Sequence, residues 1–195
     1  MTNLIYICEY NIDRSPVAEQ ITRMKIGEGH MHVNSAGLKK PGRYPYYGMT
    51  EEMREALSRS GYKLSKHNPR VLTSELLKEQ DIILCMEKSH VKEVLEKAPG
   101  LERRVHTLPE YAGYSNKEIL APSELIGEFP LFSIFERIPY KARKLVYQLF
   151  GHVDSRDYNG IIGVHLKVVK EIELYVDKTL ERMIREKFIP EPTPN

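Results

Sequence analysis

Short apolar runs alternate along this chain with longer stretches in which apolar residues recur at helical spacing. Four of the runs predict strands, at 3–8, 31–35, 81–86 and 103–107. The amphipathic stretches predict helices at 15–27, 49–60, 73–79, 88–97 and 161–187. Strands that alternate with helices in this way are typical of a parallel sheet with right-handed crossovers, so the pattern predicts an α/β fold. Ligands of such open sheets bind beyond the carboxyl ends of the strands.

The first apolar run ends in a loop that joins a thiol to a guanidinium. Cys8 stands at the carboxyl end of the run, Arg14 follows six residues later, and Ser15-Pro16 supplies the N-cap and first residue of a helix. Backbone N–H groups of such a loop can bind an anion, and Arg14 can hold two oxygens of a tetrahedral oxyanion. The same positive field favours the nucleophilic thiolate of Cys8, to which the Ser15 hydroxyl can bond. The loop therefore predicts a phosphate site, with a cysteine that only packs in the core as the alternative.

The loop resembles that of the low-molecular-weight protein tyrosine phosphatases, which share it with thioredoxin-coupled arsenate reductases. The segments that carry the resemblance are, in order, Cys8-Glu9-Tyr10-Asn11-Ile12-Asp13-Arg14-Ser15-Pro16, Asn34-Ser35-Ala36-Gly37, His67-Asn68-Pro69-Arg70, Asp81-Ile82-Ile83-Leu84-Cys85-Met86 and Leu108-Pro109-Glu110-Tyr111-Ala112-Gly113. The resemblance covers roughly residues 1–113 and 153–187. It implies an open parallel four-stranded sheet of order 2-1-3-4 with helices on both faces, the flavodoxin-like phosphatase fold.

The resemblance also implies a cysteine-dependent phosphatase that acts on phosphomonoesters, with a phosphotyrosine protein or a small aryl phosphate as substrate. Cys8 would attack the phosphorus to form a phosphocysteine, while Arg14 and loop N–H groups hold the oxygens. The residues expected to form the phosphate-binding loop are Glu9, Tyr10, Asn11, Ile12, Asp13 and Ser15, and Ser35 is expected to support this loop from behind. No metal or organic cofactor is implied, and the seven histidines show no ligand spacing.

A phosphatase of this kind also needs a general acid, because the leaving oxygen must be protonated as it departs. In the family an Asp of a late Asp-Pro loop has this role. Counting back from the last predicted helix places Asp157 nearest to that acid, with Asp154 as the alternative, although no Pro follows Asp157 and both could equally be helix caps. Tyr158 resembles an aromatic wall of the family's substrate pocket. Tyr47, from the loop at 40–48, could form the opposite wall or simply pack against the next helix.

Two residues of the loop depart from the family pattern. Tyr10 stands where the family usually has Gly, so it is either strained by a positive φ or projects outward and shapes the pocket. Asp13 stands where the family commonly has a second Cys that can form a disulfide with the nucleophile. Together with Glu9 it adds negative charge that weakens attraction for an anion. The loop is therefore slow, adapted to an unusual substrate, or retained for binding alone.

We expect a single phosphatase-like domain at 1–188, followed by a Pro-rich tail at 189–195. Within the domain, residues 115–152 are expected to be an insertion. The insertion contains four of the five phenylalanines, Phe129, Phe132, Phe135 and Phe150. Long connections of this kind are usually functional or have structure of their own. The segment could cap the active site, widen the core or form a homodimer contact, and a lid or a subunit contact is favoured.

Composition narrows the remaining classes of function. The net charge of +2 gives no electrostatic reason to expect nucleic acid or a membrane as partner. Neither a run of about 18 apolar residues nor a signal-peptide pattern occurs, and the chain has only two cysteines, so a cytoplasmic protein is expected. Two alternatives to the phosphatase remain. One is an arsenate reductase. It would need an external thiol, because Cys85 is the only other cysteine and lies in an apolar run that is expected to be buried. The other is a non-catalytic phosphate- or phosphoprotein-binding module.

Overall fold

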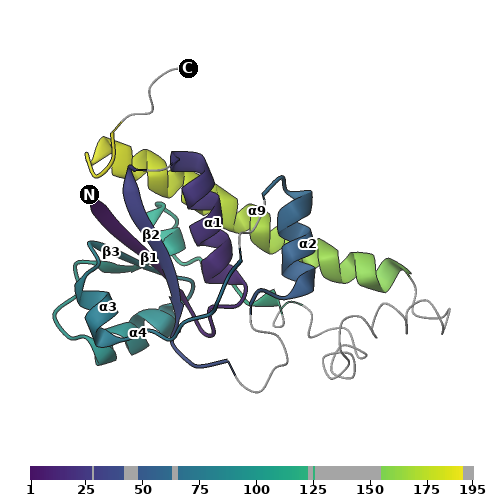
Figure 1. Ribbon diagram of the computed structural model, residues 1–195, viewed down its shortest axis with the longest axis horizontal. Helices are drawn as coiled ribbons and strands as arrows, with labels where there is room; N and C mark the ends of the chain where they lie inside the picture. The colour runs from purple at the N-terminus through teal and green to yellow at the C-terminus, as the bar shows by residue number, and fades with distance from the viewer. Residues whose placement is uncertain (28, 42–47, 63–65, 123–124, 126–154, 191–195) are drawn as a thin grey trace.

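The computed structural model describes residues 1–27, 29–41, 48–62, 66–122, 125 and 155–190, and for 155–159 it describes the backbone only. A parallel sheet of order β2-β1-β3-β4 lies at its centre (Figure 1). Its strands are β1 (Thr2–Cys8), β2 (Met31–Gly37), β3 (Ile82–Cys85) and β4 (Val105–Thr107). The predicted fold class and strand order are confirmed.

Helices connect the strands and cover the sheet. They are α1 (Arg14–Ile26), α2 (Glu51–Arg59), α3 (Ser74–Lys78), α4 (Lys88–Lys97), α5 (Leu108–Tyr111) and α9 (Ser155–Arg185). The five predicted helices are present, but α9 begins at Ser155 rather than at 161, and the short α5 follows β4 directly. The first turn of α9 is polar, so apolar periodicity could not reveal it.

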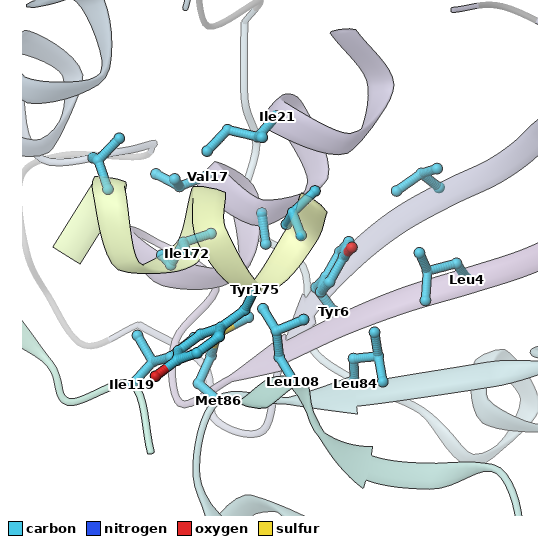
Figure 2. Packing of buried hydrophobic residues seen from close by; sticks show 14 of the residues in the cluster. Leu4, Tyr6, Val17, Ile21, Leu84, Met86, Leu108, Ile119, Ile172 and Tyr175 are labelled. Carbon is cyan, nitrogen blue, oxygen red and sulfur yellow. The ribbon is translucent and has the colours of Figure 1, made fainter. Parts of the chain in front are cut away.

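The sheet separates two apolar clusters, because side chains of successive strand residues point to opposite faces. Leu4, Tyr6 and Leu84 point to the face covered by α1 and α9 (Figure 2). Ile5, Ile7, Ile83 and Cys85 point to the other face, where they pack with Leu77 of α3 and Val94 of α4. Strands buried on both faces read as continuous apolar runs, which is why the runs in the sequence predicted parallel strands.

The C-terminal helix α9 completes the first cluster. Its Ile172 lies beside Val17 of α1, and its Tyr175 ring lies beside Met86 and Ile119 (Figure 2). It also packs against α2, so that α2 reaches the core through α9 rather than through the sheet. Charged residues recur along α9, and no helix of the described chain is both long and apolar enough to cross a bilayer.

Ile172→Ala should lower the free energy of unfolding by about 2–5 kcal/mol, because it empties a fully buried position between α9 and α1. Leu174 lies on the same helix with 45% of its surface exposed, so Leu174→Ala is the matched control. It should change the free energy by less than about 0.5 kcal/mol. Urea denaturation measures both values. Equal losses in the two variants would contradict this packing of α9.

Candidate active site

The candidate site lies at the carboxyl edge of the sheet, where the chain passes from β1 into α1. Cys8 is the last residue of β1 and Arg14 is the first residue of α1. The loop between them turns at Asn11, whose φ is 55°. Tyr10 has no positive φ and exposes 39% of its surface, so the structure favours the outward-projecting alternative over the strained one.

Close contact with the end of β2 shapes this loop. The backbone N–H of Leu38 donates to the Cys8 carbonyl at 3.0 Å, and that of Lys39 donates to the Glu9 carbonyl at 2.8 Å. A Cβ at Gly37 would lie 2.6 Å from the carbonyl carbon of Tyr10, which is closer than real Cβ contacts allow. Glycine at the end of the Ser-Ala-Gly segment is therefore required for the loop to pack here.

The side chain of Asn11 fills the inside of the loop and is fully buried. Its Nδ2 donates to the Oγ of Ser15 at 3.0 Å and to the Oγ of Ser35 at 2.8 Å, and its Oδ1 accepts from the backbone N–H of Arg70 at 3.0 Å. Its own carbonyl lies 2.7 Å from Nε2 of His67. The amide of Asn11 thus bonds to three separate segments, at Ser15, Ser35 and Arg70. Because these hydrogen bonds are buried, breaking them would be costly, and they stabilise the loop.

Ser15 links this network to the thiol. Its Oγ lies 3.0 Å from the Sγ of Cys8. The same oxygen accepts a hydrogen bond from Asn11, and its own hydrogen can be donated to the sulfur. A hydroxyl that donates to sulfur stabilises the thiolate over the thiol. Ser35 stands one step further from the thiol, where its Oγ donates to Oε2 of Glu19 at 2.6 Å.

Arg14 is held along one edge of its guanidinium and is only 5% exposed. Its Nη1 donates to Oε1 of Glu87 and to the carbonyl of Ile119, the latter at 2.5 Å. Within the described chain, Nε and Nη2 have no such partner. This leaves the pair of donors that can bind two oxygens of one oxyanion.

Two residues that hold Arg14, Glu87 and Ile119, were not predicted from the sequence. Glu87 follows Met86 directly after β3, so it stands at the same edge of the sheet as Cys8. A charged residue just beyond a central strand was the signal that could have found it. Ile119 left no such signal, because it contributes a backbone carbonyl, which any residue type can supply.

The loop between Cys8 and Arg14 contains two carboxylates, Glu9 and Asp13, and both accept hydrogen bonds. Glu9 accepts from Nζ of Lys39 at 2.9 Å, and this bond lowers the pKa of Glu9. Asp13 accepts from the backbone N–H of Thr50 at 3.1 Å and from its Oγ at 2.8 Å, and burial raises the pKa of Asp13. Thr50 is itself the N-cap of α2, so Asp13 connects the loop between β1 and α1 to that helix.

The second cysteine lies across the sheet from the first. Cys85 pairs in register with Ile7, and both side chains pack in the cluster on the α3 and α4 face. Cys8 is one residue further along and packs in the cluster on the α1 and α9 face. Burial raises the pKa of the Cys85 thiol, which keeps it protonated. The sheet backbone between the two sulfurs prevents a disulfide.

Comparison with known proteins agrees with this geometry. A family model described as low molecular weight phosphotyrosine protein phosphatase matches residues 3–155. The chain belongs to this family. Its members are hydrolases, and the resemblance of the loop is thereby confirmed.

Two curated relatives have the same family name. The low molecular weight protein-tyrosine-phosphatase Etp of Escherichia coli K12 is 30% identical over 120 residues, which cover 62% of this chain and 76% of the relative. Ptp of Acinetobacter johnsonii is 29% identical over 111 residues, 57% of this chain and 75% of the relative.

Solved structures show the same fold. The YwlE arginine phosphatase from Geobacillus stearothermophilus superposes with a TM-score of 0.69 at 18% identity, over the full length of both chains. A YwlE mutant from Bacillus subtilis gives 0.67 at 21% identity and covers 94% of this chain and 99% of its own.

Several predicted residues of this phosphatase fall outside what the structure describes. These are Tyr47, Asp154 and the side chains of Asp157 and Tyr158; the backbone of the last two lies in the first turn of α9. Of the 115–152 insertion, only 115–122 and 125 are described. Its first residues lie at the site, since the backbone N–H of Ile119 donates to the Met86 carbonyl at 2.9 Å. Among the described residues, no three His, Cys, Asp or Glu side chains gather as a metal site would require.

Gly37→Ala should lower phosphatase activity by about 10- to 100-fold, because the added Cβ displaces the loop and with it the oxyanion donors. The matched control is Gly163→Ala in α9, where a Cβ would meet no atom of the described residues within 4 Å. It should leave activity unchanged and the fold as stable or slightly more so. Hydrolysis of p-nitrophenyl phosphate measures the difference. Unchanged activity in Gly37→Ala would contradict the close packing of the loop on β2.

Asp13→Asn should change how stability depends on pH. The pKa of Asp13 is raised in the folded state, so its contribution to stability is present below the unfolded pKa and is lost as pH rises through the folded pKa. The variant keeps an acceptor for Thr50 but has no charge to bury. Its stability relative to wild type should therefore rise with pH above about 4 and then level off. Urea denaturation at several pH values measures this difference. A difference that does not vary with pH would contradict the raised pKa of Asp13.

Proposed function

We propose that this chain hydrolyses phosphomonoesters, with phosphotyrosine or another aryl phosphate as substrate, through a phosphocysteine intermediate. The observation that carries the proposal is the arrangement of Ser15, Cys8 and Arg14. The Ser15 hydroxyl lies 3.0 Å from the sulfur, close enough to donate to a thiolate. The guanidinium is held by one edge, and its other edge is unpaired among the described residues. A thiolate and a bidentate oxyanion clamp on one loop are what attack at phosphorus requires.

In the first step the Cys8 thiolate attacks the phosphorus and the bond from phosphorus to the leaving oxygen breaks. Arg14 and the loop N–H groups hold the three equatorial oxygens, whose charge is most widely spread in the transition state. The leaving oxygen takes a proton from a general acid. The product of this step is a phosphocysteine and the free phenol.

We assign the general acid to Asp157, with Asp154 as the alternative. Three described carboxylates of the loop and of the adjoining edge of the sheet already have partners: Glu9 with Lys39, Asp13 with Thr50 and Glu87 with Arg14. Glu118, which precedes Ile119, accepts from the backbone N–H of Lys88 at 2.7 Å. A proton donor is therefore expected from another part of the chain.

In the second step a water attacks the phosphorus of the phosphocysteine. The same Asp, now a carboxylate, takes the proton of this water, the bond between phosphorus and sulfur breaks, and the thiolate of Cys8 returns as inorganic phosphate leaves. Neither a metal nor an organic cofactor takes part in these steps.

The test is hydrolysis of p-nitrophenyl phosphate without added metal, across pH 4–8. Cys8→Ser should lose at least about 10³-fold in turnover because the nucleophile is gone. Arg14→Lys should lose about 10²-fold, because Lys cannot bind two oxygens with one planar group. Asp157→Ala should lose about 10²- to 10³-fold and Asp154→Ala little; the reverse would move the acid to Asp154.

The competing functions give different results in the same experiment. A folded wild-type protein that shows no turnover, but whose melting temperature rises with phosphate, would indicate a phosphate-binding module. Activity retained in Cys8→Ser would overturn the mechanism. Reduction of arsenate with an external thiol, in the absence of ester hydrolysis, would indicate a reductase.

A further inference from the structure

His90 is a buried histidine beside the candidate site to which nothing in the sequence pointed. It lies in the first turn of α4 and is 4% exposed. A polar side chain at this depth is costly unless its polar atoms have partners. The contacts of its ring therefore show what it does.

One ring nitrogen of His90 faces the carboxylate that holds Arg14. Its Nε2 lies 3.5 Å from Oε1 of Glu87, and this same oxygen accepts the hydrogen bond from Nη1 of Arg14. The other carboxylate oxygen accepts from the Oγ of Ser89, which is exposed, at 3.2 Å. Glu87 thus stands between a buried ring on one side and the guanidinium on the other.

The other ring nitrogen, Nδ1, has no hydrogen-bond partner in the part of the chain that the structure describes. The charged groups that face the ring are Glu87 and Glu93 from α4 and its N-cap, Arg14 from α1 and Glu9 from the loop. Burial lowers the pKa of His90, which keeps the ring neutral near neutral pH. A buried nitrogen without a hydrogen-bond partner lowers the stability of the fold, and the contact of the ring with Glu87 would offset this loss.

We propose that His90 is a positioning residue for Arg14, and that it acts by fixing the carboxylate of Glu87. With Glu87 fixed, Nη1 of Arg14 stays bound, and the Nε and Nη2 edge remains directed at the oxyanion. The proposal rests on the proposed function in one respect, namely that this oxyanion is the phosphoryl group of the substrate.

The expected effect is on binding more than on chemistry. Arginine has many rotamers, and holding it in one of them before the ligand arrives reduces the entropy lost on binding. Arg14 holds the phosphoryl oxygens in the ground state and in the transition state alike. Loosening it should therefore raise KM more than it lowers kcat.

Three variants separate the contact from the general effect of burial. His90→Gln keeps an N–H near the place of Nε2, whereas His90→Leu has similar bulk and no polar atom. Ser89→Ala is the matched control, because it removes only the exposed contact to the same carboxylate. His90→Leu should not lower the melting temperature, because Nδ1 of His90 has no described hydrogen-bond partner to lose. If His90→Leu does not fold, His90→Asn replaces it, because its shorter amide does not reach Glu87.

The measurements are the Kd for sulfate by calorimetry and the kinetics of p-nitrophenyl phosphate hydrolysis. His90→Leu should weaken sulfate binding about fivefold and raise KM by a similar factor, with kcat changed less. His90→Gln should stay within about twofold of wild type, as should Ser89→Ala. A wild-type Kd and KM in His90→Leu would overturn the proposal.

A double-mutant cycle tests whether His90 acts through Glu87. In a Glu87→Ala background, His90→Leu should have no further effect on the Kd for sulfate. A full fivefold loss in that background would overturn the proposal, as would a wild-type protein that binds no sulfate. If the cycle holds while wild type shows no turnover, the proposed function fails and the role of His90 stands. If turnover is present while His90→Leu changes neither the Kd nor the KM, the proposed function stands and the role of His90 fails.

Discussion

The buried amide of Asn11 is the interaction on which the site depends. Its φ of 55° turns the loop, and its two amide ends bond to α1, to β2 and to the segment before α3. The thiol of Cys8 reaches this network through Ser15. Loss of the amide would leave several buried donors and acceptors unpaired at once, so the loop has one well-defined shape before any ligand binds.

A second constraint aligns the arginine with this loop. Arg14 begins α1, but the groups that orient it are Glu87, just beyond β3, and the carbonyl of Ile119. The anion site is therefore assembled from the carboxyl edges of the two central strands together with a segment that enters later in the chain. Asp13 adds a link from the loop to α2 through Thr50. A displacement of α2 or of Ile119 would therefore act directly on the proposed phosphate site.

Apolar periodicity was enough to predict the sheet, because strands buried on both faces and amphipathic helices leave strong local patterns. The start of α9 was not predictable in this way, since its first turn is polar. The nucleophile loop was recognisable from a thiol, an arginine and a helix start in close succession. The roles of Glu87, His90 and Ile119 depend on contacts between residues far apart in the sequence, which one sequence does not reveal.

The placement of the two cysteines on opposite faces of the sheet determines how the nucleophile would respond to oxidants. An oxidised Cys8 sulfenic acid has no thiol of its own chain within reach, because Cys85 is sealed behind β1 and β3 and Asp13 stands where a resolving cysteine would be. Its recovery would depend on a small thiol that can enter the site from solvent. Without one, the sulfur would proceed to the irreversible sulfinic and sulfonic acids, so the proposed catalysis by Cys8 would last only under reducing conditions.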